Sequence, residues 1–297
     1  MSTSFKDLIE EVLSDMRGTV RNQEQSTHLT ADVTNTATSW SVANATRLAP
    51  GRVECGDELV FIDSFDKSAN TITIAPYGRA FDGSVAVAHT SGTQIVSNPR
   101  FPRMKVKNAI NNTIRGLAGN LFAVDSTVLT VTPGVQEYEL PFDALDVLSV
   151  NVEYSSNVWS ESTYWRFNPQ ASTSDFPSGV SINLGEWGVG RVEVTYATDP
   201  LPLVNLTDDF AVVTGLPESC RDVISLGAEW RLLSTLDPGD LVNNALASAD
   251  LDRFNRPQPA EVTTIATQSY RMFMQRMSEE RGKLLSRYPS KIIYTRF

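Results

Sequence analysis

The sequence contains few of the residues on which most enzyme active sites depend. Of its 297 residues, two are cysteines and two are histidines. Cys55 and Cys220 lie far apart, and neither has a cysteine or histidine neighbour at the spacing of zinc ligands. We therefore expect two buried free thiols, and we expect neither a metal nor another cofactor.

Long apolar segments are also absent. No run approaches the roughly 18 residues that a membrane-crossing helix needs. Residues 1–18, MSTSFKDLIEEVLSDMRG, lack the basic segment and hydrophobic block of a secretory signal. A hydrophobic content of 41% and a charged content of 20% are typical of a folded protein with its own core. We expect a protein that is made and folded in a cytoplasm, without a membrane partner.

Catalytic motifs are missing as well. The chain has no H-E-x-x-H pair, no phosphate-binding loop and no dinucleotide fingerprint. Ser84 lacks the G-x-S-x-G setting of a hydrolase nucleophile. The acidic pairs Asp208-Asp209 and Asp250/Asp252 are adjacent or two apart, so on a helix they point in different directions and fit caps or solvated faces. The sequence predicts that the protein is not an enzyme.

One stretch, residues 77–95 (YGRAFDGSVAVAHTSGTQI), nevertheless gathers residues of a hydrolase kind: Arg79, Asp82, Ser84 and His89. Turn chemistry explains it better. Asp82-Gly83 is typical of a hairpin turn, and Val85 and Val87 alternate with alanines as strand residues do. Three glycines allow backbone turns denied to other residues: Gly78, Gly83 and Gly92. We expect His89 to lock a loop through a hydrogen bond.

Charge is distributed unevenly along the chain. The net charge is −10, yet residues 253–297 hold nine basic and three acidic residues, so this part carries +6 and residues 1–252 carry −16. Such an asymmetry has two interpretations: a solvated helix face, or a basic tail that docks on an acidic partner.

Periodicity divides the chain into helical and β-rich parts. Apolar residues at helical spacing predict helices over residues 4–17, 99–122, 216–233, 238–254 and 260–287, and short β-rich runs with turn residues fill 27–96 and 127–200. The predicted fold class is α+β: a helical bundle core with a β-sandwich domain and an inserted small all-β domain. The predicted boundaries are 1–27 and 99–126 (helical core), 28–98 (inserted β domain), 127–205 (β-sandwich), 206–290 (helical core, continued) and 291–297 (C-terminal tail).

The first β-rich part resembles a small β module that recurs in tailed-bacteriophage proteins. The hallmark of that module is an I-G-D/E-E turn followed by R-G-x-x-G-T-x-A-x-x-H-x-x-G-T-x-V. The matching residues here are Gly56-Asp57-Glu58, Arg79, Gly83, Ala86, His89, Gly92, Thr93 and Ile95. The chain departs from the pattern in having Gly-Arg for Arg-Gly and Ser84 for threonine.

Residues 196–233, from YATDPLPL to the helix LPESCRDVISLGAEWRLL, resemble the end of the β domain and the following helix in phage head–tail connector (adaptor) proteins. This similarity of order and pattern spans most of residues 99–297. It implies a virion protein of the neck, assembled in the host cytoplasm as a dodecameric ring beneath the portal. The implied partners are the portal, tail or neck proteins, and viral DNA that passes without sequence-specific binding.

The resemblance also implies a C-terminal segment that docks on the portal. The candidate residues mix apolar anchors with charge, as interface hot spots do: Lys291, Ile292, Ile293, Tyr294, Arg296 and Phe297. A frayed end without a partner is the alternative interpretation.

Other functions remain open at this point. The same β module fits another tail, baseplate or fibre-associated structural protein. A tail-associated hydrolase built on His28 or His89 is less favoured, because it needs acids gathered around a histidine. A DNA-binding role for the basic helix at 99–122 is disfavoured by the acidic total.

Overall fold

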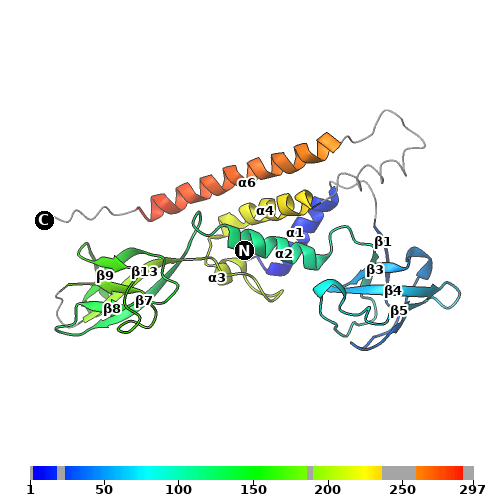
Figure 1. The fold of residues 1–297 in the computed structure, drawn as a ribbon, viewed down its shortest axis with the longest axis horizontal. Helices are drawn as coiled ribbons and strands as arrows, with labels where there is room; N and C mark the ends of the chain where they lie inside the picture. Colours follow the sequence, from blue (N-terminus) through cyan, green and yellow to red (C-terminus); the bar gives the residue numbers. More distant parts are fainter. Residues whose placement is uncertain (1–2, 19–23, 186–189, 236–258, 290–297) are drawn as a thin grey trace. The chain divides into compact units, whose positions relative to one another are not determined.

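A computed structural model describes residues 3–18, 24–185, 190–235 and 259–289 (Figure 1). The chain divides into two compact units, which are described separately. One holds residues 9–110 and 231–259, and the other holds residues 1–8, 111–230 and 260–297. Both helices and sheets are present, so the predicted α+β class is confirmed.

Four of the described helices lie within or close to the predicted ranges, whereas the short helix α3 was not predicted. Their bounds are α1 (Phe5–Gly18), α2 (Arg103–Gly116), α3 (Phe210–Thr214), α4 (Arg221–Ser234) and α6 (Pro259–Arg287). The start of α1 is a capping box, because Ser4 Oγ accepts from Asp7 N at 3.2 Å and Asp7 Oδ2 accepts from Ser4 N at 3.2 Å. The helix predicted at 238–254 lies outside the described residues.

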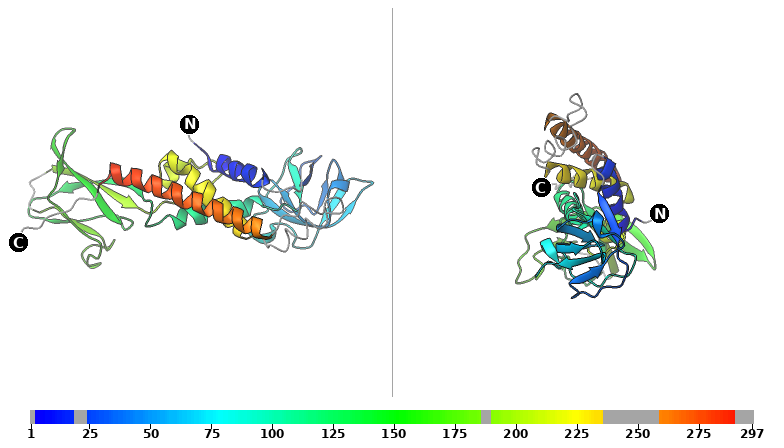
Figure 2. Two further views of the ribbon diagram at one scale, coloured as in Figure 1. Left: turned by 90° about the horizontal axis from the view of Figure 1, so that it is seen from above. Right: turned by 90° about the vertical axis from the view of Figure 1, so that its right-hand side faces the viewer.

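In the unit that holds most of the helical residues, α4 lies against both α2 and α6. A side chain at Gly227 of α4 would collide with Thr113 of α2 and would lie 2.9 Å from the ring of Phe273 in α6. Trp230 of α4 also meets Tyr270 of α6, with ring centroids 4.8 Å apart. Figures 1 and 2 show α4 and α6 side by side. The small residue at 227 therefore lets the three helices share one core.

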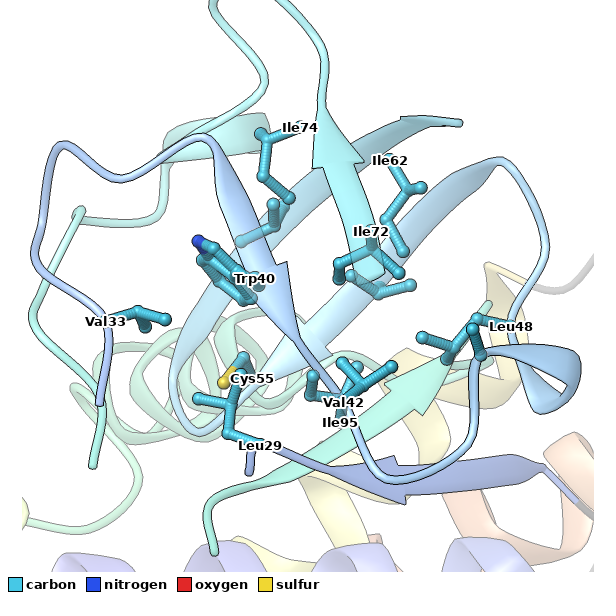
Figure 3. Packing of buried hydrophobic residues seen from close by; sticks show 13 residues of the cluster. Leu29, Val33, Trp40, Val42, Leu48, Cys55, Ile62, Ile72, Ile74 and Ile95 are labelled. Atoms are coloured by element: carbon cyan, nitrogen blue, oxygen red, sulfur yellow. The ribbon is translucent and has the colours of Figure 1, made fainter. Parts of the chain in front are cut away.

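Residues 25–97 form a single antiparallel sheet, here called the closed β unit. Its strands are β1 (Gln25–His28), β2 (Ser39–Ser41), β3 (Gly51–Cys55), β4 (Glu58–Asp66), β5 (Thr71–Ile74) and β6 (Gln94–Ser97), in the order β1-β6-β3-β4-β5-β2. The chain beyond β1 then bridges to the chain beyond β2: Leu29 pairs with Val42, and Thr30 N donates to Ser41 O at 3.0 Å. This bridge joins the two borders of the sheet around one apolar core that includes Trp40 (Figure 3).

The closed β unit corrects two predictions about residues 77–95. Asp82-Gly83 is not a hairpin turn: it belongs to a short 3-10 helix, η2 (Phe81–Gly83), with Asp82 at φ 55° and Gly83 at φ 80°. Val85 and Val87 lie in no strand and are 72% and 42% exposed. The physical reason is that Val87 N donates to the carboxylate of Glu58 instead of joining a ladder.

Residues 123–198 form two antiparallel sheets, here called the two-sheet region. One sheet has the order β10 (Val158–Ser162), β9 (Asp146–Ser155), β13 (Gly190–Thr198), β7 (Ala123–Val131). The other has the order β11 (Arg166–Asn168), β12 (Ser181–Asn183), β8 (Glu137–Glu139). Both sheets contribute to one buried cluster, for example Val150 and Val194 from the first and Ile182 from the second. Inward-facing aliphatic residues therefore hold the two sheets together.

Candidate functional site

The predicted portal-docking residues, Lys291, Ile292, Ile293, Tyr294, Arg296 and Phe297, lie outside the described residues. Their docking role therefore stays a prediction. The described part of the chain can test the other candidates, beginning with the hydrolase-like stretch at 77–95.

That stretch surrounds a buried carboxylate. Glu58 opens β4, and its side chain is fully buried. Arg79 donates to it twice, from Nε at 2.7 Å and from Nη2 at 2.9 Å. His89 Nε2 donates at 2.8 Å, and the backbone N–H groups of Ala80 and Val87 donate at 3.1 and 3.3 Å. The predicted loop-locking hydrogen bond of His89 is confirmed, with Glu58 as its acceptor.

The Arg79 guanidinium is also saturated. Besides its two bonds to Glu58, Nη1 donates to the carbonyls of Thr34 at 2.9 Å and Ala37 at 3.0 Å, and Nη2 donates to the carbonyl of Val87 at 2.8 Å. A guanidinium has five N–H donors, so all five have partners inside the closed β unit. Its planar group also lies over the ring of Trp40, 5.0 Å from the centroid. No donor of Arg79 is left for a substrate.

The electrostatics of Glu58 do not suit a catalytic base. Burial by itself raises the pKa of Glu58, but the hydrogen bonds from His89, Arg79 and the two backbone N–H groups outweigh it and lower the pKa to about 2. A base works best when its pKa lies near the working pH. The charged cluster of Glu58, Arg79 and His89 is therefore a structural lock between the β4 strand and the 77–95 loop.

In the described structure, the side chains of Ser84 and His28 make no hydrogen bond to Glu58, Arg79 or His89. Ser84 Oγ accepts from Leu59 N at 3.0 Å and is 2.9 Å from the carbonyl of Phe81, so it ties η2 to β4. His28 lies on β1 and pairs with Gln94 of β6. His89 pairs with Val33 instead; Val33 follows β1 in the chain and His89 precedes β6. A cavity beside His28 is lined by Ser26, Thr27, Ala43, Asn44, Arg47 and Gln94, and none of these described residues is an acid that could orient the imidazole.

Sequence reasoning missed the role of Glu58, which it treated only as part of the turn Gly56-Asp57-Glu58. The arginine and histidine of the phage-module pattern are the two side chains that Glu58 binds. A signal was therefore present in the sequence, because Glu58, Arg79 and His89 all belong to the pattern that this part of the chain resembles.

Two basic residues of the 99–122 segment, Arg103 and Lys107, are paired with acids at the start of α2. Arg103 Nη1 pairs with Glu10 of α1 at 2.7 Å, and Arg103 Nε pairs with Asp57 at 2.9 Å. Lys107 Nζ pairs with the other oxygen of Asp57 at 2.7 Å. The backbone N–H of Arg103 donates to Glu54, which caps the first turn of α2. These pairings engage Arg103 and Lys107 with acids of the same unit, so these two side chains are less available to DNA phosphates.

The described acidic pair behaves as predicted. Asp209 caps α3 by accepting from Val212 N at 3.0 Å. Asp208 accepts from the backbone N–H groups of Val204 and Asn205, both at 2.8 Å. Both carboxylates thus accept hydrogen bonds from nearby backbone N–H groups. The pair Asp250/Asp252 lies outside the described residues.

Both cysteines are free and buried, as expected. Burial raises the pKa of Cys55 to about 12 and that of Cys220 to about 12. Thiols in this state are poor nucleophiles at neutral pH.

In the described part of the chain, no helix has the length and apolar character to span a membrane.

Comparison with known proteins gives one family. The family model described as SU10 adaptor protein matches residues 85–282. A search of curated proteins found no match. The match includes α2, the two-sheet region, α3 and α4, and it excludes most of the closed β unit, which begins at Gln25. Because the match covers more than half of the chain, the protein belongs to the SU10 adaptor protein family and is a structural head–tail adaptor of phage virions.

Proposed function

We propose that the protein forms a dodecameric ring beneath the portal, where it extends the DNA channel and joins the capsid to the tail. The observation that carries this proposal is the family match over residues 85–282. The partners are the portal on one side, tail or neck proteins on the other, and neighbouring copies of the chain. Assembly takes place in the host cytoplasm.

The charge of the chain supports a channel through which DNA slides. Residues 1–252 carry −16, and a ring multiplies that charge around its axis. DNA phosphates are repelled by an acidic wall, so the duplex passes without sequence-specific binding. The pairing of Arg103 and Lys107 with Glu10 and Asp57 is consistent with this role, because it removes basic groups that would hold DNA.

The finer architecture belongs to the same proposal. A helical bundle core, made by residues 1–27, 99–126 and 206–290, carries the β-sandwich at 127–205 and the inserted β domain at 28–98. Residues 291–297 dock on the portal by burying Ile292, Ile293, Tyr294 and Phe297, while Lys291 and Arg296 meet acids. Several apolar anchors are needed because binding must overcome the entropy lost when the segment becomes ordered.

The test is binding to purified portal. Full-length protein and a truncation after Tyr288 are pulled down on portal at low and moderate salt, and the complexes are imaged for a coaxial ring. A matched pair of variants separates the two contributions: Lys291→Gln with Arg296→Gln removes charge, and Ile292→Ser with Phe297→Ser removes apolar anchors.

We expect the full-length protein to form a ring on the portal and the truncation to bind weakly or not at all. The charge variant should lose binding mainly at moderate salt, because screening weakens exposed ion pairs. Equal binding by the full-length and truncated proteins would place the docking surface elsewhere. Absence of any portal complex would contradict the proposed function itself.

A further inference from the structure

The first sheet of the two-sheet region has two edge strands, here called its borders. Its order β10-β9-β13-β7 leaves β10 and β7 each paired on one side. Along its whole length, from Ala123 to Val131, β7 pairs with β13. Among the described residues, no further strand or loop backbone is hydrogen-bonded to β7. The sheet therefore presents unpaired backbone N–H and C=O groups along β7.

The β7 strand lacks the usual protection of a sheet border. Its sequence, AVDSTVLTV, contains no lysine, arginine or proline, and its single charge is Asp125. Proteins normally block such borders with charges, prolines, bulges or covering segments, because an open strand pairs with another chain. Val128 in the middle of β7 is 45% exposed. A border of this kind is suited to receive another strand.

The strand at the opposite border, β10, runs in the direction required for antiparallel pairing with β7 of another copy. Every neighbouring pair in this sheet is antiparallel, so with four strands β7 and β10 run in opposite directions. When a second copy is placed beside the first in the same orientation, its β10 runs antiparallel to β7 of the first. No strand has to be reversed, and the combined sheet stays antiparallel throughout.

We propose that β7 of one copy pairs with β10 of a second copy of this chain. The contact joins two different surfaces of the same protein, and repeated contacts of this type close into a ring when the rotation between copies allows it. The inference rests on the proposed function only for the closure of that ring. It names the surface through which neighbouring subunits meet.

The exposed apolar residues support a second copy as the occupant. Around β10, Tyr154 is 87% exposed, Val158 is 57% exposed and Tyr164 is 80% exposed. Val128 of β7 and Glu161 of β10 share one face and one row of the sheet, because Val128 pairs with Glu193, Glu193 with Asn151, and Asn151 with Glu161. Pairing between copies would cover apolar surface at both borders.

Paired cysteines test this contact. Glu161→Cys is combined in turn with Ser126→Cys, Val128→Cys and Thr130→Cys, which scan the register in steps of two residues on one face of β7. Directly opposed residues have Cβ atoms about 4.5–5.5 Å apart, and diagonal ones lie about 7–8 Å apart, so one pairing should cross-link best. The native Cys55 and Cys220 are buried and give little background.

The matched control combines Glu161→Cys with Glu193→Cys. Glu193 lies on the same face and row, but on the inner strand β13, where a neighbouring copy cannot pair. Each variant is oxidised both as concentrated free protein and as portal complex, then separated on a non-reducing gel. We expect a ladder of cross-linked oligomers from one border pair, and monomer from the control and from every single-cysteine variant.

The outcomes separate this inference from the proposed function. A ring on the portal without a ladder from any border pair would overturn the strand pairing and leave the adaptor function intact. A ladder in free protein without portal binding would support the pairing and contradict the proposed function. A ladder of equal strength from the Glu193→Cys control would overturn the pairing, because it would show that the cross-links form without a specific contact.

Discussion

The closed β unit and the two-sheet region are built from similar strands, yet they leave different surfaces. In the closed β unit the bridge between Leu29 and Val42 joins the two borders of the sheet. In the two-sheet region β7 and β10 are each paired with one strand only, as far as the described residues show. Closure removes the unpaired backbone groups through which sheets associate. The two regions therefore differ in the pairing of their outer strands, although both are antiparallel.

The two regions also differ in what stabilises them. The two-sheet region relies on an aliphatic cluster that both sheets share. The closed β unit adds the buried charged cluster around Glu58, which holds a loop with three non-glycine residues in the left-handed region: Tyr77, Ala80 and Asp82. Each such residue costs roughly 1–2 kcal/mol. The hydrogen bonds to Glu58 offset this strain, so the closed β unit should be far more sensitive to loss of one charge.

The largest effect is expected from Glu58→Ala. It leaves the buried Arg79 and His89 without their carboxylate, and breaking a buried ion pair costs about 3–5 kcal/mol. We expect the closed β unit to unfold at much lower denaturant concentration than the two-sheet region. Hydrogen exchange of β3 and β4 compared with that of β9 and β13 measures the difference.

The control for this experiment is Asp63→Ala. Asp63 lies on the same strand but is exposed, so its loss should change stability by less than about 0.5 kcal/mol. Equal exchange in both regions of the Glu58→Ala variant would mean that the charged cluster does not govern the closed β unit.

A smaller effect on stability is expected when one glycine in each region is replaced by alanine. A Cβ at Gly78 would lie 2.6 Å from the carbonyl oxygen of Phe61 and 2.9 Å from that of Ala75, so Gly78→Ala must move backbone and should cost about 1–3 kcal/mol. At Gly190 of β13 the nearest atom is Glu153 O at 3.9 Å, so Gly190→Ala should be neutral or slightly stabilising. Urea midpoints of the two variants test this; a larger loss at Gly190 would reverse the comparison.

His89→Ala should have a more modest effect. It removes one hydrogen bond to Glu58 while the bonds from Arg79, Ala80 and Val87 remain, so we expect a loss of about 1 kcal/mol in the free energy of unfolding. His89→Gln, which keeps a donor, should recover part of it. No hydrolysis of glycan, peptide or nucleic acid should be detected in the wild type. An activity that disappears in His89→Ala would show that the charged cluster is catalytic.

A further expected effect depends on pH and concerns Glu54. Burial raises its pKa to about 7 from an ordinary value of 4.5, although the hydrogen bond from Arg103 N acts in the opposite direction. The folded protein then binds this proton more tightly than the unfolded chain, so stability falls as pH rises between these two values. Glu54→Gln cannot ionise and should lose that slope. Melting temperatures of both proteins at pH 5 and pH 8 measure it, and parallel profiles would contradict the assignment.

Local patterns predicted the helices α1, α2, α4 and α6 and the capping role of Asp209, and the limits of such patterns have a clear cause. The stripe of α1, the capping box of Ser4 and Asp7, and the cap at Asp209 depend on residues within four positions of each other. The Asp82-Gly83 prediction failed because Glu58, more than twenty positions away, draws Ala80 and Val87 N–H groups to itself. A distant buried charge outweighed the local turn preference.

By itself, the sequence determined the α+β class, the approximate positions of α1, α2, α4 and α6, the free thiols and the family resemblance, since periodicity and motif order are local or linear properties. Only the tertiary structure decided which acid receives Arg79 and His89, which sheet closes and which stays open. Those outcomes depend on contacts between residues far apart in the chain. For the same reason the borders β7 and β10 could not be recognised from their own residues: a strand lies at a border only because of the strands that its neighbours pair with.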